Sequence, residues 1–394
     1  MNLAAWLLFL FAFIVFYSYL GYGFLITILV FLKKKIGKAG HTFSEAPLPA
    51  VTLVVAAFNE EDFIGEKIEN SLSLDYPEGL FKLLIITDGS SDRTPEIASS
   101  YPGVIVMHQP ERRGKVAAIE RAMEKVDTPI VVFTDANTTL NKACILNIAR
   151  HYQDEKTGGV AGEKKVRSLK ETQVAGAGEG LYWKYESYLK KLDAELYTVV
   201  GAAGELFSIR THLYEKVPSD VLLDDFIISL RICQRGYRVA YEPEAYAVEA
   251  PSASMLEEQK RKIRISAGGF QSIVMLRPLL NIFRYPVLSF QYISHRVLRW
   301  AVCPFLLPLI LLLNIYLVCT NGAWPFQALL AAQVLFYAAA LVGWYYSTRN
   351  KKVKLLYVPY YFLFLNISLY LGLFRYLRGK QSVLWDKAAR ENFA

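Results

Sequence analysis

Stretches without any charged side chain constrain this chain more than any other feature of its sequence. Residues 3–32, 300–348 and 355–374 contain no Asp, Glu, Lys or Arg. The hydrocarbon core of a bilayer is about 30 Å thick and takes about 20 apolar residues in a helix, because backbone groups there must be hydrogen-bonded internally. The turn-forming segment 321–325 (Asn-Gly-Ala-Trp-Pro) divides the longest stretch. We therefore predict four membrane segments and exclude a purely soluble protein.

Basic residues flank these stretches. The chain carries 44 Lys and Arg against 36 Asp and Glu, a net charge of +8. The excess follows the first stretch, precedes the second and lies between the third and fourth, at positions 33–35, 38, 296, 299, 349, 351, 352 and 354. The positive-inside rule gives this distribution for cytoplasmic flanks. We predict an integral protein of the plasma (inner) membrane with a cytoplasmic catalytic domain, and no nucleic-acid partner.

The chain divides into an N-terminal anchor at 1–32, a catalytic domain at 47–251, amphipathic interfacial helices at 252–298, about three membrane helices at 299–375 and a basic tail at 376–394. This division contains a conflict. One crossing before a cytoplasmic domain and three after it leave the C-terminus outside, whereas a basic tail favours the inside. Either the segment 355–374 is re-entrant, or one boundary is miscounted.

Between the anchors, short apolar runs alternate with helical patterns. Strands are predicted at 51–57, 81–87, 103–108 and 129–134, and helices at 60–71, 92–100, 114–126 and 141–152. The strand segments are apolar without strict alternation, which is typical of strands buried on both faces of a parallel sheet. Strand and helix in strict alternation predict an α/β domain with a doubly wound, mostly parallel sheet.

Polar residues follow three of these strands. Asn59 and Glu60 follow the first strand, Asp88 the second, and Asp135 and Asn137 the fourth. Helix capping would explain any one of them. In doubly wound sheets, however, ligands bind beyond the carboxyl ends of the strands, and carboxylates that converge there repel each other unless a cation is bound. Oxygen ligands in this setting suit Mg²⁺ or Mn²⁺ holding a diphosphate.

A basic segment opens the helix predicted at 114–126. Gly114 permits close approach of the backbone, and Lys115 adds a positive charge at a helix N-terminus, a combination that suits phosphate. The spacing is not that of a Walker loop, and no GxGxxG segment is present. A P-loop nucleoside triphosphatase and an enzyme with a dinucleotide-binding Rossmann domain are therefore disfavoured.

Taken in order, these motifs resemble the membrane-embedded family 2 glycosyltransferases with a GT-A fold, the group that includes poly-N-acetylglucosamine, hyaluronan, chitin-oligosaccharide and cellulose synthases. The resemblance covers about residues 51–271 and implies a GT-A catalytic domain inserted between transmembrane helices. It implies that a nucleotide-sugar donor, UDP-linked as in this group, is bound by Asn59, Glu60, Asp88, Lys115 and Asp135.

The same resemblance implies a metal site and a catalytic base. Asp135 and Asn137 occupy the position of the DxD motif and would hold Mg²⁺ or Mn²⁺, although an amide replaces the second acid. Asp224 and Asp225 occupy the position of the Thr-Glu-Asp motif, which makes Asp225 the general base and Asp224 an acceptor-side residue. Alternatively, both acids are helix-start residues stabilised by the helix dipole.

Further acceptor-binding residues follow from the resemblance. Gly204 and Glu205 match the small-residue segment near the acceptor. The segment 259–263 is a partial match to QxxRW, with lysine in place of the arginine and isoleucine in place of the tryptophan, so Gln259 and either Arg261 or Arg264 would contact the acceptor. Alternatively, the segment is an amphipathic helix on an anionic leaflet, and both interpretations are compatible.

Three functions remain open at this point. The first is an inverting transferase that extends a polysaccharide at the membrane, with or without coupling to export. The second adds one sugar to a membrane lipid such as a polyprenyl phosphate or diacylglycerol, and the altered 259–263 segment favours it. The third is an inactive scaffold or sensor of a transport complex, which the acids at 88, 135 and 225 disfavour. Accessory subunits, the sugar and the linkage stay open.

Overall fold

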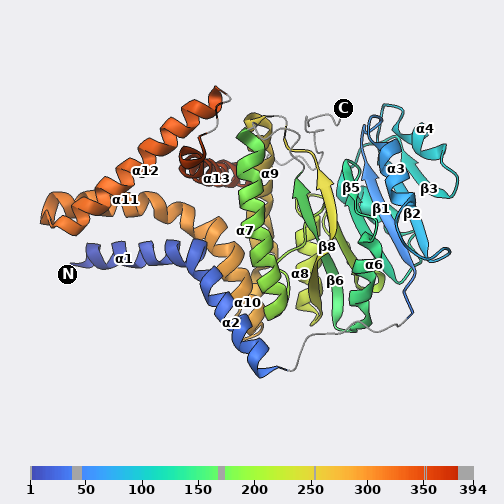
Figure 1. Cartoon of the computed structure of the whole chain (residues 1–394), viewed down its shortest axis with the longest axis horizontal. Helices are drawn as coiled ribbons and strands as arrows, with labels where there is room; N and C mark the ends of the chain where they lie inside the picture. The colour runs from blue at the N-terminus through green and yellow to red at the C-terminus, as the bar shows by residue number, and fades with distance from the viewer. Residues whose placement is uncertain are drawn as a thin grey trace.

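The computed structural model describes residues 2–37, 47–166, 174–252, 254–349, 351 and 353–379. It places a mixed α/β domain at one end of the molecule and long helices at the other (Figure 1). Most of the predicted basic tail at 376–394 lies outside the described residues.

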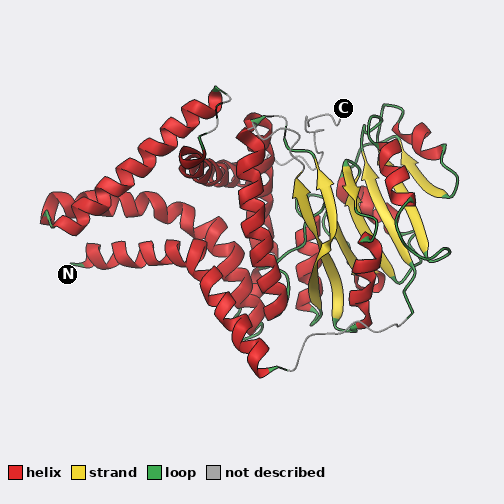
Figure 2. Ribbon diagram, viewed as in Figure 1, coloured by secondary structure: helices red, strands yellow, loops and turns green. Residues whose placement is uncertain are grey.

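An eight-stranded sheet with the order β3-β2-β1-β4-β7-β6-β8-β5 forms the centre of the α/β domain (Figure 2). The first four strands are parallel to one another, whereas β7 runs antiparallel to β4 and β6, and β5 runs antiparallel to β8. The strands are β1 Val51–Ala57, β2 Phe81–Asp88, β3 Val104–Gln109, β4 Ile130–Asp135, β5 Thr138–Leu140, β6 Thr157–Val166, β7 Leu206–Arg210 and β8 Arg238–Glu249. The predicted mostly parallel sheet is confirmed.

Both faces of this sheet are buried. Val54 of β1 packs into the core on one face, and its neighbours Leu53 and Val55 pack into the core on the other. This burial explains why the sequence of β1 is continuously apolar. The helices of the domain are α3 Ile64–Leu72, α4 Thr94–Ser99, α5 Lys115–Met123, α6 Cys144–Arg150 and α8 Asp224–Gln234, with short 3₁₀ turns at His151–Gln153 and Thr211–Leu213.

Within the part of the chain that the structure describes, four helical stretches are long and apolar enough to cross a membrane. They are Leu3–Ile36, Pro286–Asn321, Trp324–Thr348 and Leu355–Leu377. The first stretch contains α1 Leu3–Phe16, a π-helical segment Tyr17–Gly21 and α2 Tyr22–Ile36. The second contains α10 Pro286–Tyr292, a π-helical segment Ile293–Val302 and α11 Cys303–Asn321. The third and fourth are the single helices α12 Trp324–Thr348 and α13 Lys354–Leu377. The predicted break is confirmed, because Gly322 ends α11 with a φ of 60° and α12 begins at Trp324.

Two further helices, α7 Val174–Leu196 and α9 Met255–Met275, lie between the sheet and the apolar helices (Figure 1). A 3₁₀ turn at Arg277–Leu280 leads from α9 to α10. Buried ion pairs join α7 to the π-helical segment Ile293–Val302. His295 of that segment lies 2.6 Å from Asp193 and 3.2 Å from Glu186, and Arg296 lies 2.5 Å from Glu186. These buried charges are paired, as such charges must be to be tolerated, and they attach the membrane helices to the catalytic domain.

Candidate active site

The carboxylate of Asp88, at the end of β2, holds the loop that begins α5. It is fully buried and accepts hydrogen bonds from the backbone N–H of Arg113 at 3.1 Å and of Gly114 at 2.6 Å, and from the guanidinium of Arg121 at 3.3 Å. Gly114 adopts a φ of 93°, a backbone conformation that favours glycine. Asp88 therefore fixes the position of Lys115, the first residue of α5.

The loop after β1 lies against the loop after β2. The side chain of Asn59, which has a φ of 52°, accepts a hydrogen bond from the backbone of Ser91 at 2.9 Å, and its own backbone N–H donates to the Ser90 hydroxyl at 3.1 Å. The backbone N–H of Glu60 donates to the Thr94 hydroxyl at 2.8 Å. The first two predicted donor residues are thus joined to the segment that follows Asp88.

One amine faces three carboxylates that come from two distant parts of the sequence. The Nζ of Lys115 lies 2.6 Å from the carboxylate of Asp135, at the end of β4. Burial lowers the pKa of Lys115, but the negative charges of Asp135, Asp224 and Asp225 outweigh this effect and raise the pKa above its ordinary value. We call Asp135, Asp224 and Asp225 the acidic cluster. The loop at Arg113 and Gly114, whose backbone is hydrogen-bonded to Asp88, connects this cluster to the end of β2.

Asp225 has the protonation behaviour of a base that works near neutral pH. Its pKa is raised to about 7, mainly by burial and also by the charges of Asp224 and Glu205, while the charge of Lys115 opposes the rise. A general base is most effective when its pKa lies near the working pH. One oxygen of Asp224 is buried and has no hydrogen-bond partner among the residues that the structure describes. The cluster therefore has negative charge in excess of what Lys115 neutralises.

Gly204 leaves the space in which the amine of Lys115 and the carboxylate of Asp225 meet. A Cβ atom at this position would lie 3.1 Å from the Nζ of Lys115 and 3.5 Å from an oxygen of Asp225. Gly204 is placed there by β7, which begins at Leu206. The predicted small-residue segment thus borders the acidic cluster directly.

We expect Gly204→Ala to lower kcat about tenfold, because a displaced amine or carboxylate no longer meets its partner correctly. The stability should change little, since the nearest atom is the end of a flexible lysine. Steady-state kinetics and thermal unfolding measure the two quantities. Gly65→Ala is the matched control, because its Cβ would face Tyr101 and Ile97. Equal kinetic effects of both substitutions would contradict this role for Gly204.

Two predicted acceptor residues belong to a separate network of ion pairs. Glu205 lies 2.6 Å from Lys164, which also pairs with Glu249. Arg261 lies 3.1 Å from Glu258 and 3.8 Å from Glu249. Burial raises the pKa of Glu205, but Lys164 more than compensates and lowers it below its usual range. The structure therefore gives Glu205 and Arg261 partners in β6, β8 and α9.

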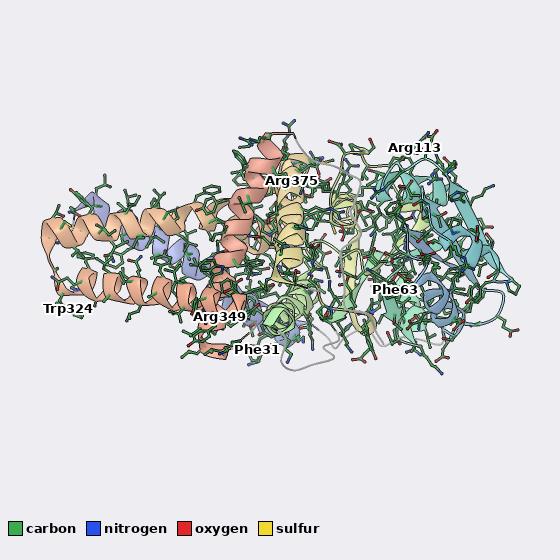
Figure 3. The ribbon with its side chains drawn as sticks, turned by 90° about the horizontal axis from the view of Figure 1, so that it is seen from above. Phe31, Phe63, Arg113, Trp324, Arg349 and Arg375 are labelled. Carbon is green, nitrogen blue, oxygen red and sulfur yellow. The ribbon has the colours of Figure 1, made fainter. Side chains whose placement is uncertain are left out.

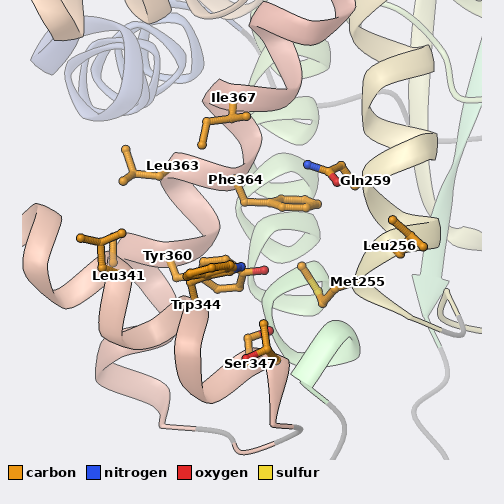
Figure 4. A pocket seen from close by; sticks show the side chains of 12 residues that line it. Met255, Leu256, Gln259, Leu341, Trp344, Ser347, Tyr360, Leu363, Phe364 and Ile367 are labelled. Carbon is orange, nitrogen blue, oxygen red and sulfur yellow. The ribbon is translucent and has the colours of Figure 1, made fainter.

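Two further predicted residues, both on α9, lie in different surroundings. Burial lowers the pKa of Arg264, while the negative charges of Asp224, Asp135 and Asp225 oppose that shift, so this guanidinium faces the acidic cluster. Gln259 instead lines a cavity of about 470 Å³ between α9, α12 and α13 (Figure 4). The other lining residues are mostly apolar, with Ser347 and Thr348 as exceptions. The apolar and aromatic ones are Met255, Leu256, Ala340, Leu341, Trp344, Tyr360, Leu363, Phe364 and Ile367.

The turn after β4 fits a divalent cation that is shared with a phosphate ligand. Asp135 and Asn137 are both partly exposed and lie two residues apart. Within the described part of the chain, no group of three or more His, Cys, Asp or Glu side chains is arranged to hold a metal ion. Mg²⁺ commonly takes only one or two protein carboxylates and completes its shell with substrate phosphates and water. The oxygen ligands present here match that mode of binding.

A buried lysine, which the sequence did not reveal, supports the turn after β4. The Nζ of Lys67, on α3, donates to the Thr134 hydroxyl at 3.1 Å and to the backbone carbonyl of Thr138 at 2.8 Å, the residues on either side of Asp135 and Asn137. Burial lowers the pKa of Lys67 to about 7. A lysine among the apolar positions of the helix predicted at 60–71 was the only available signal.

Comparison with known proteins agrees with this geometry. The family model described as glycosyl transferase family 2 matches residues 52–217. Over 263 residues the chain is 26% identical to a poly-beta-1,6-N-acetyl-D-glucosamine synthase of Staphylococcus aureus, covering 62% of this chain and 61% of that protein. Over 171 residues it is 32% identical to a beta-monoglucosyldiacylglycerol synthase of Trichormus variabilis, covering 41% of this chain and 35% of that protein.

A solved structure shares the fold over nearly the whole chain. It is the mannosyltransferase PcManGT from Pyrobaculum calidifontis in complex with GDP-Man and Mn²⁺, which superimposes with a TM-score of 0.72 at 21% identity and covers 96% of this chain and 100% of that one. The predicted GT-A fold is confirmed. The chain spans about three fifths of the length of the Staphylococcus aureus synthase. Residues 52–217 therefore match glycosyl transferase family 2, and the GT-A domain that contains them adjoins helices that are long and apolar enough to cross a membrane.

Proposed function

We propose that this protein transfers a sugar from a nucleotide-sugar donor to a growing polysaccharide at the membrane surface, with inversion at the anomeric carbon. The observation that carries the proposal is the single amine of Lys115, placed 2.6 Å from Asp135 and facing Asp225 beside Gly204. This arrangement puts a group for the leaving diphosphate and a base for the acceptor within one small volume. The similarity to a poly-beta-1,6-N-acetyl-D-glucosamine synthase supports a polysaccharide product.

On the donor side, the diphosphate would bind at the start of α5. Backbone N–H groups at a helix N-terminus and the charge of Lys115 favour an anion there, and Asp88 holds this loop in place. When bound to Asp135 and Asn137, Mg²⁺ or Mn²⁺ would neutralise charge that develops on the leaving group. The Mn²⁺ and GDP-Man bound by PcManGT support a divalent cation and a nucleotide sugar at this site.

On the acceptor side, Asp225 would accept the proton of the attacking hydroxyl. Its pKa of about 7 leaves a substantial fraction of the carboxylate ionised near neutral pH. Attack on the face of the sugar opposite the diphosphate inverts the anomeric centre in one step, so no covalent nucleophile is required. Arg264 of α9 and Gly204, just before β7, border the acidic cluster, and together with Asp224 at the start of α8 they would position the acceptor.

The proposed location is the plasma (inner) membrane, with the catalytic domain in the cytoplasm. The basic residues Lys33, Lys34 and Lys35 at the end of α2 support this orientation, because such residues are enriched on the cytoplasmic side.

The test is to incubate the full-length protein in membranes with UDP- and GDP-sugars and either Mg²⁺ or Mn²⁺, and then to size the products. The proposal predicts donor turnover that depends on a divalent cation and a ladder of increasing polymer length. A single glycolipid would replace the polysaccharide by a lipid acceptor. Complete absence of donor turnover over this panel would support the scaffold interpretation and overturn the proposal.

A second candidate, transfer of one sugar to a membrane lipid, is favoured by the cavity that Gln259 lines. Its largely apolar walls come from α9, α12 and α13 and would accept a hydrocarbon chain (Figure 4). The similarity to a beta-monoglucosyldiacylglycerol synthase supports the same candidate. We expect Leu363→Trp, which fills the cavity, to raise KM for a lipid acceptor and to leave donor affinity unchanged. An unchanged KM for that lipid would contradict binding in this cavity.

A further inference from the structure

We propose that α13 lies along the leaflet next to the catalytic domain and does not cross the membrane. The chain would then cross three times, through α1, α11 and α12, and its C-terminus would lie on the same side as the catalytic domain. This inference concerns how the protein contacts lipid, and it holds whichever sugar or acceptor the enzyme uses.

The first step is that α9 is attached to the catalytic domain along its length. Near its start, Glu258 accepts a hydrogen bond from Ser252 at 2.9 Å. Near its end, Gln271 donates to the backbone carbonyl of Asp220 at 2.9 Å and accepts from the backbone N–H of Leu222 at 3.1 Å, in the loop that leads to Asp224. The first half of α9 also carries charges at positions 257, 258, 260, 261, 262 and 264. Such a helix cannot lie in hydrocarbon.

The second step is that α13 runs parallel to α9 and in contact with it. The hydroxyl of Tyr357 lies 3.9 Å from the sulfur of Met255, and that of Tyr361 lies 3.5 Å from Glu258. Fifteen residues after Tyr357, a Cβ at Gly372 would lie 2.9 Å from the backbone nitrogen of Ala267. Figure 3 shows α13, which ends near Arg375, running beside α9 and across the direction of α11 and α12. Both ends of α13 are therefore at the level of the catalytic domain.

The third step is that the inner ends of all three crossing helices meet α13. Tyr19, after α1, donates to Asn366 at 3.4 Å. Phe305, at the start of α11, has its ring centroid 5.2 Å from that of Tyr370. Near the end of α12, a Cβ at Gly343 would lie 2.9 Å from the Cβ of Tyr360.

The outer ends of α11 and α12, by contrast, lie far from the catalytic domain, where Figure 3 labels Trp324. A fourth crossing that started beside the inner end of α12 would bring Tyr370 next to the outer half of α11. Tyr370 instead contacts Phe305, two residues after α11 begins. The position of α13 is thus incompatible with a parallel bundle of four crossings.

The remaining surface of α13 suits a lipid monolayer. Tyr357, Tyr361 and Phe364 are buried on one side, whereas Leu355, Phe374 and Leu377 are exposed on the other. An apolar helix face that no protein covers is stable against acyl chains at the membrane interface. Arg375, in the last turn of α13, and Arg378, just after it, then lie on the catalytic side. The resulting topology removes the conflict between four crossings and a basic tail.

Accessibility of single cysteines to a membrane-impermeant maleimide tests this topology in intact cells. Cys319→Ser removes the exposed cysteine, while Cys144, Cys233 and Cys303 are buried. In that background we compare Asn321→Cys at the outer turn, Glu111→Cys on the catalytic domain and Arg378→Cys after α13. We expect Asn321→Cys to react from outside, and the other two to react only after permeabilisation. Reaction of Arg378→Cys from outside would overturn the proposal.

A depth measurement keeps the test decisive if labelling at position 378 fails. Leu355 and Leu377 are both exposed, and at a rise of about 1.5 Å per residue they lie about 33 Å apart along α13. Spin labels at cysteines placed there report their depth through contact with oxygen and with a water-soluble nickel complex. We expect both labels within about 10 Å of the same membrane surface. Labels at opposite surfaces would show a crossing helix.

Discussion

Replacing Asp225 by asparagine should reduce kcat about 1000-fold while leaving donor binding nearly intact. The asparagine side chain occupies nearly the same volume but cannot accept the proton of the attacking hydroxyl. Asp225 is also the member of the acidic cluster whose pKa is raised to about 7, which identifies it as the group that titrates near working pH. Initial rates with a labelled donor and a separate nucleotide-binding titration measure the two effects.

Asp127→Asn is the matched control, since Asp127 is exposed and pairs with Lys82 just before β4. We expect this variant to keep full activity. Turnover by Asp225→Asn at the rate of the control would remove the assignment of Asp225 as the base.

The dependence of kcat/KM on pH provides an independent test of the role of Asp225. Because only the ionised carboxylate accepts a proton, kcat/KM should rise with pH and level off above about 7. Asp224 contributes to raising the pKa of Asp225, so Asp224→Asn should move this rise to lower pH. A rise that does not move in Asp224→Asn would show that another group controls the profile.

Replacing Lys115 by methionine should lower kcat/KM by about 100-fold to 1000-fold, the usual effect of removing one stabilising donor from a site where negative charge develops. The substitution leaves Asp135, Asp224 and Asp225 without the amine they share. We expect weaker donor binding, because the diphosphate would then approach uncompensated carboxylates. Lys115 also lowers the pKa of Asp225, so the rise of kcat/KM should move to higher pH in this variant.

Two comparisons make this result specific. Lys115→Arg keeps the positive charge and should recover part of the donor affinity. Lys82→Met removes an exposed lysine that pairs with Asp127, and it should leave both kinetic constants unchanged. Unchanged donor affinity in Lys115→Met would contradict the placement of the diphosphate at the start of α5.

The parallel half of the sheet could be predicted because its strands are apolar on both faces. The predicted bounds of β1 agree with the structure, and those of β2 differ only at Asp88. The strands β5 to β8 were not predicted. β8 mixes exposed and buried positions without a regular period, and β5 has only three residues. Their pairing depends on contacts with distant strands, which local pattern does not reveal.

The sequence placed the acids at the ends of strands, but it did not reveal which cations they meet. The contact of Lys115 with Asp135 joins α5 to β4, and only the folded chain brings them together. The roles of these residues in binding and catalysis remain predictions. Glu205 and Arg261 pair with Lys164 and Glu258, contacts that motif matching did not reveal.

Hydropathy predicted a membrane segment at 355–374, where α13 is long and apolar enough to cross a membrane, but it does not distinguish a crossing helix from one that lies in a leaflet. Both present an apolar face to acyl chains. The distinction comes from the charged helix α9 beside it and from the contact of Tyr370 with the start of α11. Neither contact has a signature in the sequence.

The most direct measurement of the central claim is a cryo-electron microscopy structure of the full-length protein with Mn²⁺ and the nucleoside diphosphate of its active donor. We predict that the diphosphate lies between the Nζ of Lys115 and the carboxylate of Asp135, with Mn²⁺ on Asp135 and Asn137 and with Asp225 facing the open side. A nucleotide bound elsewhere, with Lys115 still paired to Asp135, would contradict the account.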